Sequence, residues 1–191
     1  MAEKGCKVET RQVDLRNKEQ FLPAFRAINP EVTVPVLQLA DGSRLTDIVG
    51  ICRYLDELTP EPPLFGDTPL GKATVESWQR WCDREGFYAV MDGFRNSTPG
   101  LRGRALPGPV DYEQIPALAA RSRDRILHFF RRLDERLDEA HFVGGSAFSI
   151  ADITAVVAVD FASWIKLRPP SRLRHLQRWQ EEVSRRPSWA A

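Results

Sequence analysis

The feature that most constrains the fold is the segment Thr59–Pro69, which reads TPEPPLFGDTP and holds four prolines and a glycine. Proline inside a helix removes a backbone donor and clashes with the preceding turn, so no helix crosses this segment. Before it the sequence mixes strand and helix patterns, and after it the patterns are helical. We therefore expect two domains, over residues 1–58 and 69–191, joined by a linker over residues 59–68.

The first half alternates short strand and helix patterns. Partial alternation of apolar and polar residues predicts a strand over Lys7–Leu15, and Thr33–Leu39 predicts a second strand that begins near a proline. Asp41-Gly42 is a tight-turn signal, so Arg44–Thr46 is expected to pair back as the second arm of a hairpin. The remaining segments that read as helices are Asn17–Ile28 and Asp47–Leu58.

The second half begins with a long helix from Pro69 or Leu70 to about Phe94, with Thr68 as its N-cap. A loop rich in proline and glycine follows over Asn96–Val110. The next helix is expected over Glu113–Ala140, because apolar residues recur along one face of it.

The sharpest local signal is the sequence FSIAD at 148–152. Ser149 is expected to cap a helix, with the Asp152 carboxylate reaching back to the Ser149 amide. The helix that follows is apolar nearly all round, so we expect it to be the buried centre of its domain and to end at Pro169-Pro170. A last helix is expected over Leu173–Arg186.

Composition excludes several classes of protein. The formal net charge is +1, without the basic excess typical of a nucleic-acid binder. No apolar run approaches the roughly 20 residues that span a bilayer, so we expect a cytoplasmic protein that contacts no membrane. No metal is expected, because the cysteines and histidines lack metal-ligand spacing. These residues are Cys6, Cys52, Cys82, His128, His141 and His175.

Four motifs, in this order along the chain, resemble segments of the cytosolic glutathione transferases of bacterial type. They are Asn29-Pro30 with VPVL at 34–37, RLTDIVGICRYL at 44–55, FSIAD at 148–152, and HLQRW at 175–179 followed by RPS at 186–188. The resemblance implies a thioredoxin-like α/β N-terminal domain with sheet order 2-1-3-4, followed by an all-α helical domain. It also implies transferase activity with glutathione as co-substrate and a homodimer.

The resemblance also implies an N-terminally truncated chain. Members of this family open with a strand, a loop that carries the catalytic Ser, Tyr or Cys, and a helix that ends in a sequence like LAEKG. This chain starts at Met1-Ala2-Glu3-Lys4-Gly5, which resembles the last turn of that helix. We therefore expect that the first strand and most of the first helix are lacking, and that the catalytic residue is unknown and lies outside this sequence.

The glutathione site that the resemblance implies reduces to four residues. If the bond from Val34 to Pro35 is cis, Val34 offers its amide and carbonyl to the peptide like an added strand; the alternative is an ordinary trans proline at a strand start. Asp47 is expected to receive the glutamyl ammonium group, or else only to cap its helix. Ile48 stands where the family has a serine, so a hydroxyl donor to the glutamyl carboxylate is gone.

The second substrate is expected to be a small apolar electrophile in an apolar cleft. Candidates are Tyr88, Met91, Phe94 and Trp164, although an aromatic residue at helical spacing more often belongs to a core. Arg102 and Arg104 either contact an acidic substrate or are solvated. Cys52 is read as a packing residue, and Cys6 as an exposed thiol with little support as a nucleophile.

The motifs and the resemblance are consistent with two alternative functions. The first is an enzyme that conjugates or transfers glutathione to a small apolar electrophile. The alternative is a non-catalytic member of the same fold that acts as a binding or regulatory protein, which Ile48 and the absent opening segment favour. The sequence names neither the electrophile nor the pathway.

Overall fold

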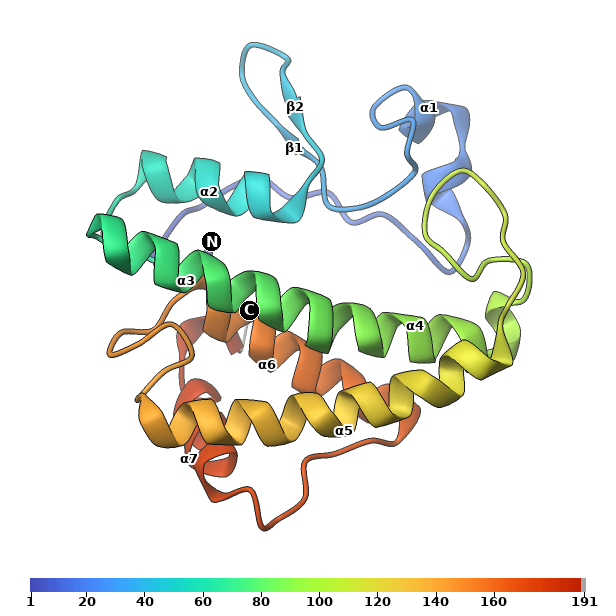
Figure 1. Ribbon diagram of the computed structural model, residues 1–191. Coiled ribbons are helices and arrows are strands. Elements are labelled where there is room, and N and C mark those ends of the chain that lie inside the picture. The colour runs from blue at the N-terminus through green and yellow to red at the C-terminus, as the bar shows by residue number, and fades with distance from the viewer. Residues whose placement is uncertain (190–191) are drawn as a thin grey trace.

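The computed structural model describes residues 1–189 as helices around a central buried helix, with one small hairpin (Figure 1). The α-helices are α1 (Pro23–Arg26), α2 (Ile48–Leu58), α3 (Pro69–Trp81), α4 (Tyr88–Ser97), α5 (Pro116–Glu139), α6 (Ile150–Ala162) and α7 (Arg174–Val183). A π-helical turn, Cys82–Phe87, joins α3 to α4. Short 3-10 turns lie at Ala2–Lys4, Glu19–Phe21, Pro99–Leu101, Ser163–Ile165 and Pro187–Trp189. Among these residues no helix is both long and apolar enough to cross a bilayer.

The sheet is smaller than the sequence suggested. Strands β1 (Leu37–Gln38) and β2 (Arg44–Leu45) pair antiparallel, with Leu37 opposite Leu45. The predicted hairpin is therefore confirmed in a shortened form. The prediction of a strand over Lys7–Leu15 is wrong, because this segment forms no strand. The described residues 1–189 form a two-stranded sheet and do not show the four-strand order 2-1-3-4. A strand needs a partner for its ladder, and none lies beside 7–15 in the described chain.

The helices were predicted more accurately than the strands, because the capping and periodicity patterns that indicate a helix lie within the helix itself. Thr68 caps α3 by accepting from Gly71 N at 3.0 Å, and Asp47 caps α2 by accepting from Gly50 N at 2.7 Å. The helix expected over Asn17–Ile28 is wrong as one element, since it is split into a 3-10 turn and the short α1. Helix α6 ends before the expected Pro169-Pro170, since Lys166 adopts a left-handed φ of 61° after a 3-10 turn.

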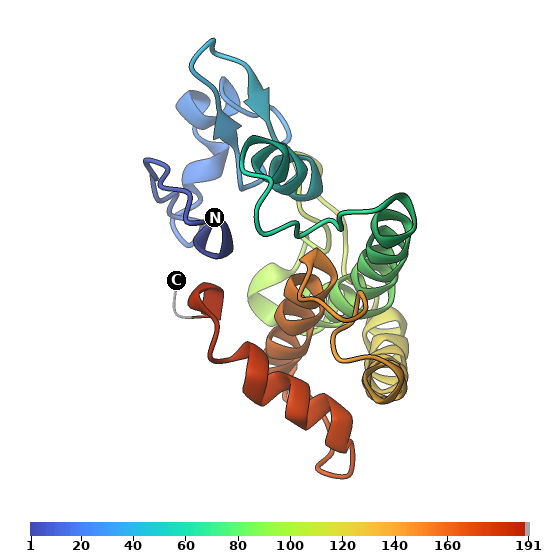
Figure 2. The same cartoon turned by 90° about the vertical axis from the view of Figure 1, so that its left-hand side faces the viewer.

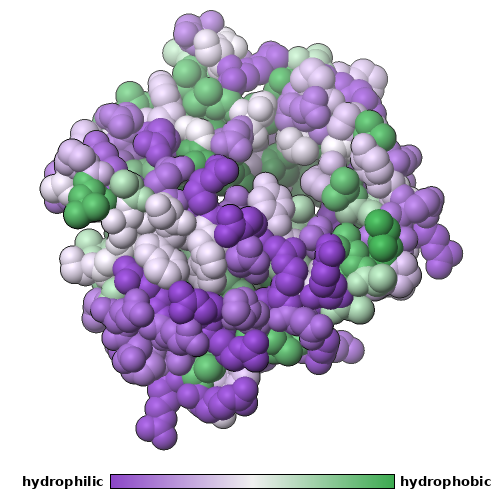
Figure 3. All heavy atoms as spheres, in the orientation of Figure 1, coloured by the Kyte–Doolittle hydropathy of each residue, from purple (hydrophilic) through white to green (hydrophobic). Residues whose placement is uncertain are grey.

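The core lies almost entirely in the helical part of the chain. Helix α6 lies behind the pair formed by α3–α4 and α5 (Figure 1), and eight of its 13 residues are buried. The largest fully buried side chains are Trp179, Phe129, Phe130, Ile126, Leu133 and Leu176. The outer surface over α5 is hydrophilic (Figure 3), as expected from its charged face. Val49 and Cys52 of α2 pack against this core, so the helical part positions α2.

The two ends of the described chain lie close together in both ribbon views (Figures 1 and 2). Glu3 accepts from Arg186 Nη2 at 2.8 Å and from Ser188 Oγ at 2.6 Å, and its side chain is 4% exposed. The Arg186 guanidinium also lies 3.8 Å from the centre of the Phe148 ring. Burial acts to raise the pKa of Glu3, but the hydrogen bonds from Arg186 and Ser188 outweigh it and lower the pKa below its ordinary value.

Substituting Glu3→Gln is expected to lower the free energy of unfolding by about 1.5–3 kcal/mol, the usual contribution of hydrogen bonds to a charged group. Because the folded-state pKa of Glu3 is lowered, its stabilisation is present above about pH 4.3, the ordinary glutamate pKa, and is lost as the pH falls through the lowered value. Urea unfolding from pH 7 to pH 3 measures both effects. The exposed Glu9→Gln is the control, and equal acid sensitivity of the two variants would contradict this role.

Candidate functional site

The first part of the site is the turn that leads into β1. Asn29 is 2% exposed and holds this turn through its Nδ2, which donates to Thr33 O at 2.9 Å, and its Oδ1, which accepts from Glu31 N at 3.1 Å. The bond between Val34 and Pro35 that follows is cis. Val34 is exposed, and its amide and carbonyl make no hydrogen bond within residues 1–189. These two groups are therefore free to pair with an extended peptide.

The second part is the N-terminus of α2, which follows directly after β2. Asp47 uses Oδ1 to cap the helix, while its Oδ2 has no hydrogen-bond partner among residues 1–189. Ile48 is the first residue of the helix and is 53% exposed. The free amides and the helix dipole at this end attract a carboxylate. The Ile48 side chain adds no polar group to it.

Helix α2 lies beside α3 and runs antiparallel to it (Figure 1). Arg53 Nη2 of α2 pairs with Glu76 Oε2 of α3 at 2.7 Å. On the π-turn, burial raises the pKa of Asp83, the Arg80 charge opposes this shift, and the Asp47 charge adds to it. The Asp83 charge is in turn the main cause that raises the pKa of Tyr88, with burial and Asp47 adding to it. Asp47, Asp83 and Tyr88 therefore share one electrostatic environment.

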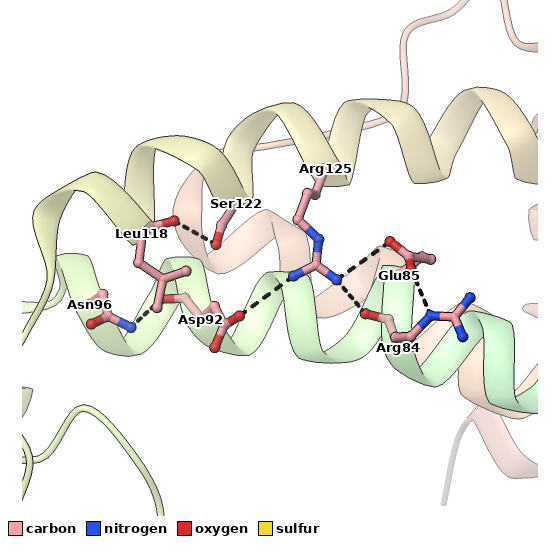
Figure 4. Close-up of polar contacts among 7 residues, drawn as sticks. All are labelled: Arg84, Glu85, Asp92, Asn96, Leu118, Ser122 and Arg125. Carbon is pink, nitrogen blue, oxygen red and sulfur yellow. Dashed lines mark hydrogen bonds and ion pairs between the residues drawn. The ribbon is translucent and has the colours of Figure 1, made fainter.

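A network on the other side of the π-turn fixes its position against α5 (Figure 4). Arg125 of α5 donates to Arg84 O at 2.7 Å and pairs with Glu85 at 3.4 Å and Asp92 at 3.5 Å. Gly86 packs so closely that an added Cβ would lie 2.7 Å from Phe129 Cζ. The backbone of the turn is thus held from two sides.

An apolar cavity of about 650 Å³ opens beside α6 and α4. The rings of Phe94, Phe161 and Trp164 meet edge to face in it, with centroids 5.4–5.6 Å apart. The cavity is lined by Phe87, Phe94, Ile153, Val156, Val157, Asp160, Phe161, Trp164, Val183, Ser188 and Trp189. Such a mostly apolar lining, with five aromatic side chains, suits a flat apolar molecule.

Phe94 and Trp164 were expected at an apolar cleft and line this cavity, whereas Tyr88 and Met91 do not. Tyr88 lies on another face of α4, because six residues of regular α-helix rotate it by about 120° from Phe94. Sequence reasoning missed Phe87 and Phe161. Phe87 lies seven residues before Phe94, two helical turns away, and that spacing was a usable signal.

The remaining candidate residues make contacts that stabilise the fold, or are buried within it. Arg104 lies over the Phe21 ring at 4.1 Å and pairs with Asp111 at 3.8 Å. Burial is the main cause that raises the pKa of the half-buried Cys52 thiol, which disfavours the nucleophilic thiolate. Cys6 Sγ lies 3.5 Å from Thr59 Oγ1. No group of three or more His, Cys, Asp or Glu residues that could hold a metal is found among residues 1–189.

Comparison with known proteins gives the family. Residues 1–58 match the family described as "Glutathione S-transferase, N-terminal domain", and residues 104–187 match "Glutathione S-transferase, C-terminal domain". Glutathione S-transferase 2 of Saccharomyces cerevisiae is 35% identical over 98% of this chain and 79% of its own length.

Solved structures of glutathione S-transferases are also similar to this chain. A glutathione S-transferase domain-containing protein of Marinobacter aquaeolei superposes with a TM-score of 0.89 at 34% identity, over 98% of this chain and 90% of that one. Gtt2 of Saccharomyces cerevisiae gives 0.83 at 34% identity, over 94% and 84% of the two chains. The thioredoxin-like and helical halves expected from the sequence are those of this fold, and the chain belongs to the glutathione S-transferase family.

Proposed function

We propose that this protein is a glutathione transferase that joins the thiol of glutathione to a small apolar electrophile. The observation that carries the proposal is the pair of free backbone groups at Val34 beside the capped N-terminus of α2. The first offers strand-like pairing to a peptide, and the second offers a site for its carboxylate. Relatives that cover the whole chain are named glutathione S-transferases, which supports this ligand.

In this reading Val34 and Pro35 hold the cysteinyl unit of glutathione, and Asp47 with the first turn of α2 holds the γ-glutamyl group. The electrophile occupies the aromatic cavity that Phe94 and Trp164 line. Tyr88 and Met91 are outside that lining, so we do not assign them to the electrophile in this cavity. Transfer then requires a thiolate that is stabilised and aligned with the electrophile.

Three further statements belong to the proposal. We divide the chain into a glutathione-binding domain over 1–58 and a helical domain over 69–191, joined by a linker over 59–68. The family match that ends at residue 58 and the start of α3 at Pro69 support this division. We expect a homodimer, as the resemblance implies. We also place the protein in the cytoplasm, where the three free cysteines would remain reduced.

Turnover of a chromogenic aryl halide tests the proposal. The purified protein is expected to accelerate product formation, with a rate that saturates in glutathione and vanishes when glutathione is omitted. Glutathione binding without turnover of any of a set of aryl halides, epoxides and enones would support the non-catalytic alternative. Absence of both would contradict the proposal.

Substituting Ile48→Ser is expected to strengthen glutathione binding by tenfold or more. The serine hydroxyl would donate to the γ-glutamyl carboxylate, and a hydrogen bond to a charged group contributes roughly 1.5–3 kcal/mol. Calorimetric titration measures the change in Kd. Ile48→Ala is the matched control, since it removes the same exposed apolar side chain without adding a donor. Equal affinities of the two variants would show that no carboxylate lies at this end of α2.

A further inference from the structure

The apolar cavity beside α4 and α6 contains a single charged side chain in its lining, that of Asp160. Ser188 is polar, and the other lining residues are aliphatic or aromatic. Among residues 1–189 no lysine, arginine or histidine lines this cavity, so no cation in the lining balances the carboxylate. A molecule that is apolar except for one positive charge is therefore complementary to this lining.

Asp160 occupies the middle of the stripe with which α6 lines the cavity. Val156 lies one helical turn before it, and Trp164 lies one turn after it, in the 3-10 turn that continues α6. The other members of the stripe are Ile153, Val157 and Phe161. Trp164 is 67% exposed, so much of its indole ring is available to a ligand. The charge thus belongs to the same face as the aromatic side chains.

The aromatic rings of the cavity favour the same kind of ligand. The rings of Phe94, Phe161 and Trp164 are neighbours of one another, and the Phe87 ring centroid lies 5.8 Å from that of Phe161. The face of such a ring carries a partial negative charge, which attracts a cation. Quaternary ammonium groups are recognised by aromatic rings in this way. The rings and the carboxylate therefore both attract a positively charged ligand.

The other polar groups around the cavity already have partners. Glu3 holds Ser188 in place by accepting from Ser188 N at 3.1 Å and from Ser188 Oγ at 2.6 Å. Glu3 is in turn paired with Arg186 at 2.8 Å. The Asp160 carboxylate, by contrast, makes no hydrogen bond and no ion pair within residues 1–189. It is the acid that remains for a ligand.

We propose that this cavity binds aromatic molecules that carry one cationic centre, a quaternary ammonium or protonated amine group, and that Asp160 selects them over neutral molecules of the same shape. The aromatic body packs among Phe94, Phe161 and Trp164, and the cationic centre lies between the Trp164 ring and the Asp160 carboxylate. This preference does not require glutathione. Where the proposed transfer takes place, it narrows the electrophiles to those that carry such a centre.

Two probes of equal shape test the proposal. They are 3-hydroxyphenyltrimethylammonium and 3-tert-butylphenol, which differ only in the nitrogen cation and the carbon that replaces it. In calorimetric titrations wild-type protein is expected to bind the cation more tightly, and Asp160→Asn is expected to weaken that binding about fivefold without changing the affinity for the neutral probe. Asp160→Glu should keep the preference for the cation. The exposed Asp124→Asn on α5 removes the same charge elsewhere and should change neither affinity.

The outcomes separate this inference from the proposed function. Equal or tighter binding of the neutral probe by wild type, or equal weakening of both probes by Asp160→Asn, would overturn the inference. Unchanged binding of the cation by Asp160→Asn would overturn it as well, as would the lack of saturable binding of the cation at millimolar concentration. Neither probe is an electrophile. A protein that prefers the cation but turns over no electrophile would therefore contradict the proposed function and leave the inference standing.

Discussion

Replacing Asp152 by alanine is expected to lower the free energy of unfolding by about 4 kcal/mol or more, a loss of exceptional size for one substitution. Asp152 is fully buried at the start of α6. Its Oδ1 accepts from Val143 N at 2.8 Å and from Trp179 Nε1 at 2.9 Å, and its Oδ2 accepts from Ser149 N at 3.0 Å. The alanine would leave these donors unpaired in the core, at roughly 1–3 kcal/mol each.

The same side chain connects three parts of the helical domain, since its partners lie before α6, at its cap and on α7. Since typical domains are stable by roughly 5–15 kcal/mol, the alanine variant should be largely unfolded at modest temperature. Thermal and urea unfolding followed by circular dichroism measure the effect. Asp152→Asn should be intermediate, because its carbonyl can still accept from Val143 and Trp179. An alanine variant whose free energy of unfolding lies within 1 kcal/mol of wild type would contradict this stabilising role of Asp152.

Replacing Gly86 by alanine is expected to lower the free energy of unfolding by about 1–3 kcal/mol, the usual cost of overpacking a core. A Cβ at this position would lie 2.7 and 2.8 Å from two carbons of the Phe129 ring and 3.1 Å from Ala158 Cβ. Phe129 is itself fully buried, so its ring has little room to move.

Gly100→Ala is the matched control for this substitution. It adds the same methyl group in a 3-10 turn where nothing lies within 4 Å of the new atom. Urea unfolding of the two variants should therefore give a clear loss for position 86 and a change within about 0.5 kcal/mol for position 100. Equal stabilities would show that the close packing at Gly86 relaxes without cost.

The elements that the sequence predicted well are those with local causes. Helix α2 and the N-caps at Asp47 and Thr68 follow from periodicity and capping residues within a few positions. The box formed by Ser149 and Asp152 was predicted for the same reason and is confirmed by the bond between the Ser149 amide and Asp152 Oδ2. The strand expected over Lys7–Leu15 failed because pairing depends on a distant partner rather than on the segment itself.

The π-turn shows why part of the site escaped prediction. Its sequence, CDREGF, continues the helical pattern of α3 and carries no break signal. The turn accompanies the packing of Gly86 against Phe129 and Ala158, which come from other helices. It places Tyr88 over Asp83, whose carbonyl accepts from the Tyr88 amide five residues on. This placement depends on tertiary contacts that no local spacing encodes.

We expect this chain to bind glutathione at Val34 and at the N-terminus of α2. Calorimetric titration of wild-type protein and Asp47→Asn with glutathione tests it most directly, because asparagine keeps the helix cap while it removes the charge. We expect saturable binding to wild type, with one glutathione per chain, and at least about tenfold weaker binding to the variant at an unchanged unfolding temperature. No saturable binding to wild type at millimolar glutathione, or equal affinity of the two proteins, would contradict it.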